Sequence, residues 1–115
     1  MSVKILHNPR CSKSRQTLEI IREEGIEPMI VEYLKTPPNR DELIEILQKL
    51  SLSPRQLMRK GEAEYKENNL ADDTLSDDQL IDAMVEFPKL IERPIVIHNG
   101  QVRIGRPPES VLEIL

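Results

Sequence analysis

An Asn-Gly pair between two β-rich runs is the feature that most limits how this chain can fold. Asn99 and Gly100 separate Ile95–His98 from Gln101–Ile104. A two-residue hairpin turn of the favoured type needs positive φ at both positions, which Asn and Gly adopt more readily than other residues. The pair therefore predicts a tight antiparallel hairpin, with His98 solvated beside the turn.

The beginning of the chain has the pattern of a strand, a helix and a second strand. Val3–Leu6 is a short apolar run, and a turn through Pro9 follows it. A helical pattern starts at about Cys11 and ends at Gly25, where a helix C-cap belongs. Pro28–Tyr33 reads as the next strand. Two strands with a helix between them favour a parallel pair joined by a crossover.

Helix-start signals then recur through the middle of the chain. They are Asn39 with Glu42, Ser53 with Pro54, and Ser76 with Gln79. The polar stretch 62–74 is expected to be irregular or a short helix, and Pro107-Pro108 starts a final helix. The order predicts an α/β chain with a thioredoxin-like fold, in which a helical insertion separates the βαβ half from the ββα half. We expect a single domain over residues 1–115.

The composition argues against several classes of protein. Sixteen basic and twenty acidic residues give a formal net charge of -4, whereas a nucleic-acid binder normally has a basic surplus. No apolar run approaches the roughly 20 residues of a membrane span. The N-terminal segment lacks the pattern of a signal peptide, and the chain has one cysteine. A free thiol without an export signal predicts a cytoplasmic protein.

The position of the single cysteine predicts a reactive thiol. Cys11 follows a strand and opens a helix, where free backbone N–H groups and the helix dipole stabilise a thiolate. Arg10, Lys13 and Arg15 add positive potential. A free cysteine is more often a small buried residue, but Cys11 has polar neighbours rather than an apolar stripe. We expect its pKa to lie below the value of about 8.5 for a free thiol.

Two familiar thiol motifs do not fit the spacing. A Cys-x-x-Cys redox pair needs a second cysteine where Ser14 stands, and a Cys-x5-Arg anion loop needs arginine where Thr17 stands. The chain cannot form an internal disulfide, so a second thiol must come from another molecule. Two histidines and one cysteine far apart provide no metal-ligand spacing.

The segment from His7 to Arg15 resembles the active-site loop of the glutaredoxin-coupled arsenate reductases. Its sequence is His-Asn-Pro-Arg-Cys-Ser-Lys-Ser-Arg, and Thr17-Leu18 follows as in that family. The resemblance extends in order over nearly the whole chain. The other matching segments are Tyr33–Pro38, Leu57–Lys60, Arg93–Val96 and Arg106-Pro107.

The resemblance implies an enzyme, an arsenate reductase with one nucleophilic cysteine, Cys11. It implies that Arg59, Arg93 and Arg106 hold arsenate or a similar oxyanion, although each taken singly is more often a surface residue. It also implies a cis peptide at Arg93-Pro94, which would bring Arg93 to Cys11. Glutathione would resolve the thiol–arsenate adduct and glutaredoxin would complete the reduction. No bound cofactor and no metal are implied.

Three further residues of the loop have a supporting role in this hypothesis. His7 could tune the thiolate, or it could be a turn residue packed at the strand end. Ser14 could donate a hydrogen bond to the thiolate, or it could be an N-terminal capping group. Arg15 adds positive charge near Cys11.

Two other functions remain open from the sequence. One is a glutathione-dependent thiol transferase without a role in arsenic chemistry, because Cys-x-x-Ser suits monothiol exchange. The other is a polymerase-binding module like a related branch of transcription regulators, which often carries Cys-x-x-Cys. The Ser14 position argues against a dithiol switch of that kind.

Overall fold

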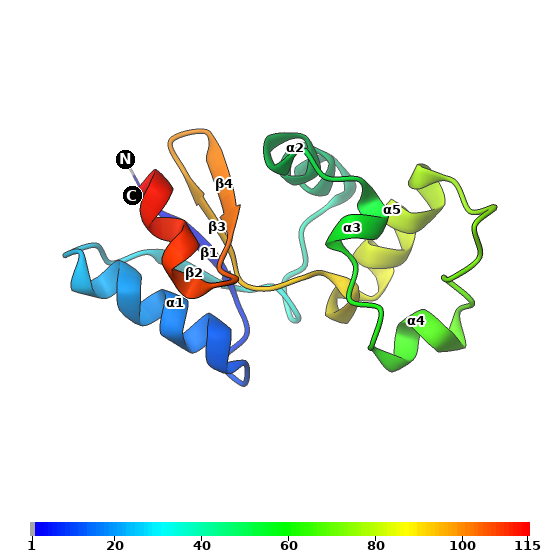
Figure 1. The fold of residues 1–115 in the computed structure, drawn as a ribbon, viewed down its shortest axis with the longest axis horizontal. Coiled ribbons are helices and arrows are strands. Elements are labelled where there is room, and N and C mark those ends of the chain that lie inside the picture. The colour runs from blue at the N-terminus through cyan, green and yellow to red at the C-terminus, as the bar shows by residue number, and fades with distance from the viewer. Residues whose placement is uncertain (1) are drawn as a thin grey trace. The chain divides into compact units, whose positions relative to one another are not determined.

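The computed structural model describes residues 2–115, which divide into two compact units. One unit comprises the residues up to Thr36 together with Arg93–Leu115, and the other comprises Pro37–Glu92 (Figure 1). The second unit is the predicted helical insertion. That the two units form a single domain stays a prediction. Within residues 2–115, none of the helices has the length and apolar character that a membrane crossing requires.

A four-stranded sheet forms the centre of the first unit, with the strand order β2-β1-β3-β4. The strands are β1 (Lys4–His7), β2 (Met29–Glu32), β3 (Ile95–His98) and β4 (Gln101–Ile104). β1 is parallel to β2 and antiparallel to β3, and β3 is antiparallel to β4. Both the predicted parallel pair and the predicted hairpin are confirmed. Asn99 has φ 59° and Gly100 has φ 75°, as the hairpin turn requires.

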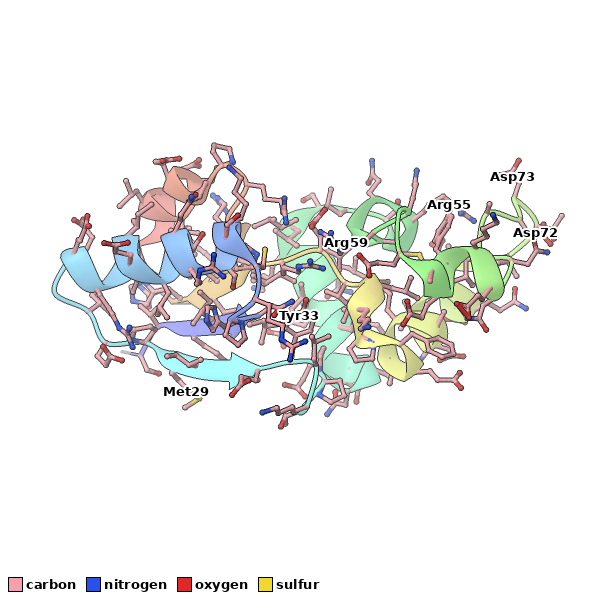
Figure 2. All side chains as sticks on the ribbon, turned by 90° about the horizontal axis from the view of Figure 1, so that it is seen from below. Met29, Tyr33, Arg55, Arg59, Asp72 and Asp73 are labelled. Atoms are coloured by element: carbon pink, nitrogen blue, oxygen red, sulfur yellow. The ribbon has the colours of Figure 1, made fainter. Side chains whose placement is uncertain are left out.

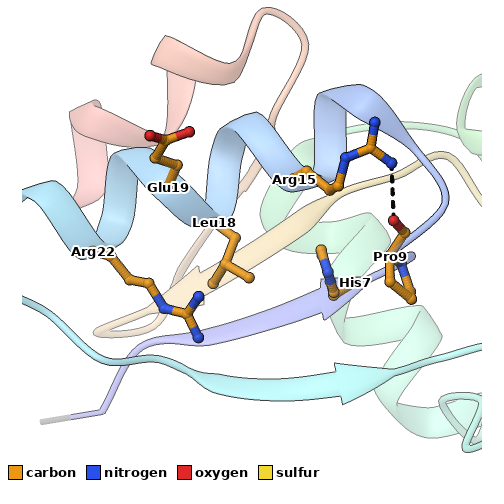
Figure 3. A pocket seen from close by; sticks show the side chains of 6 residues that line it. All are labelled: His7, Pro9, Arg15, Leu18, Glu19 and Arg22. Carbon is orange, nitrogen blue, oxygen red and sulfur yellow. Dashed lines mark hydrogen bonds between the residues drawn. The ribbon is translucent and has the colours of Figure 1, made fainter.

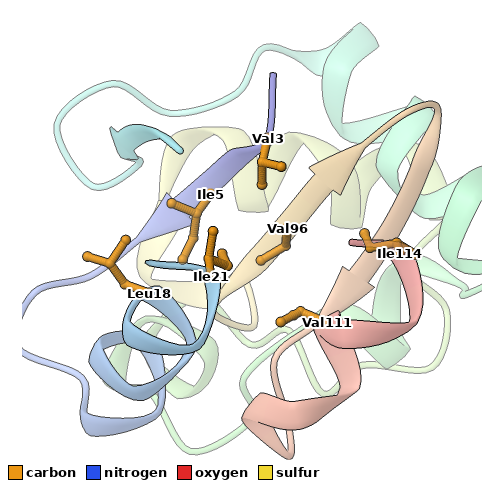
Figure 4. Packing of buried hydrophobic residues seen from close by; sticks show 7 residues of the cluster. All are labelled: Val3, Ile5, Leu18, Ile21, Val96, Val111 and Ile114. Atoms are coloured by element: carbon orange, nitrogen blue, oxygen red, sulfur yellow. The ribbon is translucent and has the colours of Figure 1, made fainter. Parts of the chain in front are cut away.

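One face of this sheet packs against helix α1 (Ser12–Glu23) and a C-terminal 3₁₀ helix, η2 (Pro108–Ile114). The two helices contact each other and share one apolar cluster with the sheet (Figure 4). Its buried members are Val3, Ile5, Leu18, Ile21, Val96, Val111 and Ile114. α1 ends as predicted, with Gly25 at φ 80° just beyond it.

Two details of the C-terminal segment differ from the sequence-based expectation. The final helix starts where Pro107-Pro108 predicts, but it is a 3₁₀ helix, a form that short terminal pieces often take. His98 is not simply solvated, because its Nδ1 lies 2.6 Å from the carbonyl oxygen of Ile114. The imidazole thus connects the end of β3 to the end of η2.

The second unit is helical, and α2, α3 and α5 begin at the predicted residues. It contains α2 (Arg40–Leu50), α3 (Pro54–Leu57), α4 (Ala63–Glu67), α5 (Asp77–Glu86) and a 3₁₀ turn, η1 (Pro88–Leu90). Reciprocal capping boxes at Asn39, Ser53 and Ser76 satisfy backbone N–H groups at three of these starts. α5 packs against α2, α3 and η1. Segment 62–74, which lacked a clear pattern, contains the short α4.

An arginine on α3 holds the loop that follows α4 (Figure 2). The Arg55 guanidinium donates hydrogen bonds to the Tyr65 hydroxyl at 2.8 Å and to the carbonyl oxygens of Leu70 at 2.7 Å and Asp72 at 3.0 Å. A single cation thereby satisfies three acceptors in a segment with little regular structure.

Gly105, which directly follows β4, lies in a tight contact with Thr17 on α1 and with Pro94 just before β3. A Cβ atom there would clash with Oγ1 of Thr17 on α1 and would lie 2.7 Å from Cγ of Pro94. The Gly105 N–H also donates to the Pro94 carbonyl oxygen at 2.9 Å. Only a residue without a side chain fits between these neighbours.

We predict that Gly105→Ala destabilises the protein by about 1–3 kcal/mol, the usual cost of overpacking a tight site. The measurement is the free energy of unfolding in urea. Gly61→Ala is the matched control, because a Cβ at Gly61 meets nothing within 4 Å. Equal stability of the two variants would show that the contact can relax at little cost.

Candidate active site

The thiol stands at the junction of β1 and α1. β1 ends at His7, and the Cys11 N–H donates to the carbonyl oxygen of Asn8 at 3.0 Å. Cys11 is the N-cap residue of α1, and its carbonyl oxygen accepts from the Arg15 N–H at 3.0 Å. Its side chain is partly exposed. The sulfur therefore sits beside the free N–H groups of the first helical turn.

Ser14 fixes the loop that carries Cys11. Its side chain is fully buried, and its Oγ accepts from the Asn8 N–H at 3.0 Å and lies 2.6 Å from Nδ1 of His7. Burial lowers the pKa of His7; Glu32 opposes this shift, and Arg22 and Arg15 add to it. With a neutral imidazole, the Ser14 hydroxyl donates a hydrogen bond to Nδ1 of His7 while it accepts one from the Asn8 N–H. The three residues thus form one buried hydrogen-bonded unit.

The pKa of Cys11 is lowered by its surroundings. Burial of the thiol acts in the opposite direction and raises the pKa. Hydrogen bonding from the Ser14 backbone N–H, the hydrogen bond and charge of the Arg93 side chain, and the Lys13 backbone N–H outweigh that effect. The Ser14 group that lowers the thiol pKa is its backbone N–H, while its hydroxyl is bound to His7 and Asn8.

Two arginines from the far end of the chain lie at the thiol. Nη2 of Arg106 is 3.7 Å from Sγ of Cys11, and Nε of Arg106 donates to the carbonyl oxygen of Arg93 at 2.7 Å. The predicted cis peptide at Arg93-Pro94 is present, and a second cis peptide, which the sequence did not indicate, joins Arg106 to Pro107. The structure therefore brings Arg93 and Arg106 together with Cys11.

Arg59, labelled in Figure 2, belongs to the second unit. Two carboxylates of that unit hold it. Its Nη1 lies 2.7 Å from Glu92, and its Nε lies 3.3 Å from Glu62. Residues 57–59 run beside residues 90–92, since Arg59 N–H donates to the Leu90 carbonyl and Glu92 N–H to that of Leu57. Neither glutamate was identified from the sequence. Glu62 follows Arg59 by three residues, but the approach of Glu92 depends on the fold.

Arg15 has a different position from the other arginines. Its Nη1 donates to the carbonyl oxygen of Pro9 at 3.0 Å, and its side chain is exposed. Arg15 is not among the groups that shift the pKa of Cys11. Across residues 2–115, no group of three or more His, Cys, Asp or Glu side chains could hold a metal ion.

The pKa of Cys11 provides a test of the role of Arg93. We expect the rate of Cys11 alkylation to rise with pH around a midpoint below that of a free thiol, about 8.5. Arg93→Gln should move this midpoint upward, because it removes one hydrogen bond to the thiolate and one nearby positive charge. Arg10→Gln is the control, since Arg10 neighbours Cys11 but does not shift its pKa. An equal shift in both variants would contradict the assignment to Arg93.

Known proteins of similar sequence and structure identify the family of this chain. The model of the ArsC family matches residues 6–114. An Escherichia coli protein named "Uncharacterized protein YfgD" is 59% identical over 98% of this chain and 96% of its own length. An Escherichia coli "Arsenate reductase" is 50% identical over 99% of this chain and 81% of its own length. A solved structure of an arsenate reductase from Vibrio cholerae is 58% identical, with a TM-score of 0.96 over 100% of this chain and 98% of that chain. The chain therefore belongs to the ArsC family, whose thioredoxin-like fold it has.

Proposed function

We propose that this protein reduces arsenate to arsenite with Cys11 as the nucleophile. The observation that carries the proposal is the position of the thiol, which has a lowered pKa and lies 3.7 Å from the Arg106 guanidinium. Relatives at about half identity are named arsenate reductase. A thiolate next to guanidinium groups suits an attack on an oxyanion, because the arginines offset the charge of both reactants.

The first step is substitution at arsenic. The Cys11 sulfur forms a bond to arsenic, and one As–O bond breaks. Because Cys11 attacks as the thiolate, the departing hydroxide takes a proton from solvent and leaves as water. Arg93 and Arg106 hold the remaining oxygens, and Arg59 is the third arginine proposed for this role. Planar guanidinium groups suit this task because they stay charged and donate paired hydrogen bonds.

The second step needs a thiol from another molecule, because the chain has a single cysteine. Glutathione thiolate attacks the Cys11 sulfur, and the S–As bond breaks with its electron pair staying on arsenic. Arsenic is thereby reduced from As(V) to As(III) and leaves as arsenite. Cys11 and glutathione are left as a mixed disulfide. A glutaredoxin thiolate then attacks the glutathione sulfur of this disulfide, and Cys11 leaves as the thiolate. This dependence on external thiols fits a cytoplasmic protein, and no bound cofactor takes part.

Cys11→Ser should abolish arsenite formation in the presence of glutathione and glutaredoxin, because a serine hydroxyl is not ionised at neutral pH. The measurement is arsenite produced per enzyme, with circular dichroism to establish that the variant is folded. Ser12→Ala is the control, since Ser12 is exposed beside Cys11. Turnover by folded Cys11→Ser at the wild-type rate would exclude Cys11 as the nucleophile.

The thiol-transferase alternative is favoured by the single cysteine and the buried Ser14 of the Cys-x-x-Ser sequence. Turnover on arsenate and turnover on a mixed glutathione disulfide separate the two functions. We expect Arg106→Gln to lower kcat/KM for arsenate by about 10- to 150-fold, the loss of one hydrogen bond to a charged group at about 1.5–3 kcal/mol. Arg103→Gln should leave it unchanged. A high turnover on the disulfide, with none on arsenate, would favour the transferase.

A further inference from the structure

A cavity of about 390 Å³ lies along α1 beside the loop that carries Cys11 (Figure 3). This volume is within the range of small-molecule sites. All of its lining residues belong to the first unit: His7, Pro9, Arg15, Leu18, Glu19 and Arg22. Arg15, at one end, donates its backbone N–H to the Cys11 carbonyl oxygen. The cavity is therefore lined by a residue one helical turn beyond Cys11.

The lining combines apolar surface with charged groups. Leu18 and Pro9 provide apolar walls, and His7 contributes an imidazole whose pKa is lowered, chiefly by burial. Of the two guanidiniums, that of Arg22 is already paired with Glu27 at 3.0 Å. Arg15 is bound only to the Pro9 carbonyl oxygen among residues 2–115 and has no carboxylate partner there. Arg15 is thus the cation available to an incoming anion.

We propose that this cavity binds the glutathione co-substrate, with a glutathione carboxylate on Arg15; the inference rests on the proposed function. Glutathione has two carboxylates, one ammonium and an uncharged peptide body. The cavity has complementary groups. Arg15 can bind a carboxylate, Glu19 can attract the ammonium, and the apolar walls can contact the body. A simple inorganic anion would need neither the apolar walls nor the glutamate.

The residues that line the cavity are distinct from those proposed to hold the oxyanion. Arg93 and Arg106 are proposed to hold the arsenic, and neither of them lines the cavity. A glutathione held by Arg15 therefore does not compete with the oxyanion for these two cations.

Binding of S-methylglutathione to the wild-type protein tests the inference without any arsenic chemistry. Its thioether can neither reduce arsenic nor take part in thiol–disulfide exchange. Titration followed by NMR should shift the His7 ring resonances. Arg15→Gln should weaken binding about tenfold or more, since one charge-assisted hydrogen bond is lost. Arg10→Gln is the matched control, since Arg10 is an exposed arginine of the same loop that does not line the cavity. Equal binding to Arg15→Gln and wild type, or no binding at all, would overturn the proposal.

Kinetics with two thiols then separate this inference from the proposed function. Arg15→Gln should raise KM for glutathione but not for 2-mercaptoethanol, which has no carboxylate, and it should leave KM for arsenate unchanged. If wild type binds S-methylglutathione in an Arg15-dependent manner but forms no arsenite, the reductase function fails while the site stands. If arsenite forms and Arg15→Gln changes neither thiol's KM, the site fails while the function stands.

Discussion

The close approach of Gly105 to Thr17 and Pro94 determines where Arg93 and Arg106 lie. Arg93 directly precedes Pro94, and Arg106 directly follows Gly105, so the contact brings both arginines to the same place. Two hydrogen bonds hold the segments together, from Gly105 N–H to the Pro94 carbonyl at 2.9 Å and from Arg106 Nε to the Arg93 carbonyl at 2.7 Å. Thr17 lies on α1, whose N-cap is Cys11. The same packing thereby connects the arginine pair to the helix that carries the thiol.

The thiol itself depends on a second set of contacts, within the loop between β1 and α1. Ser14 is fully buried and binds both His7 and the Asn8 backbone, so the loop cannot swing away from the helix without leaving these polar groups unsatisfied. Asn8 in turn accepts the Cys11 N–H. Cys11 is therefore held at the start of α1 from both sides. The lowered thiol pKa is a consequence of this backbone geometry together with Arg93.

Local sequence signals predicted most of the fold and one part of the site. The capping boxes at Asn39, Ser53 and Ser76 and the turn at Asn99 each depend on residues a few positions apart, and the structure has all of them. The helix-start position of Cys11 is local in the same way. The 3₁₀ form of the final helix and the His98 contact could not be found in this manner, because they depend on how η2 packs. Arg93 and Arg106 are separated from Cys11 by most of the sequence, so only the family resemblance indicated that they lie close to it.

Arg59 shows that the fold can neutralise a cationic side chain with acidic neighbours that the sequence does not reveal. Arg93 and Arg106 flank a thiol, whereas Arg59 lies between Glu62 and Glu92, so these three side chains together have a formal charge of −1. The two carboxylates thus already neutralise the Arg59 guanidinium within the second unit. An oxyanion that binds Arg59 must replace a carboxylate or share the guanidinium with it. Sharing is possible because a guanidinium has five N–H donors. The contribution of Arg59 to anion affinity is therefore the difference between two interactions, and it should be smaller than that of an arginine without acidic neighbours.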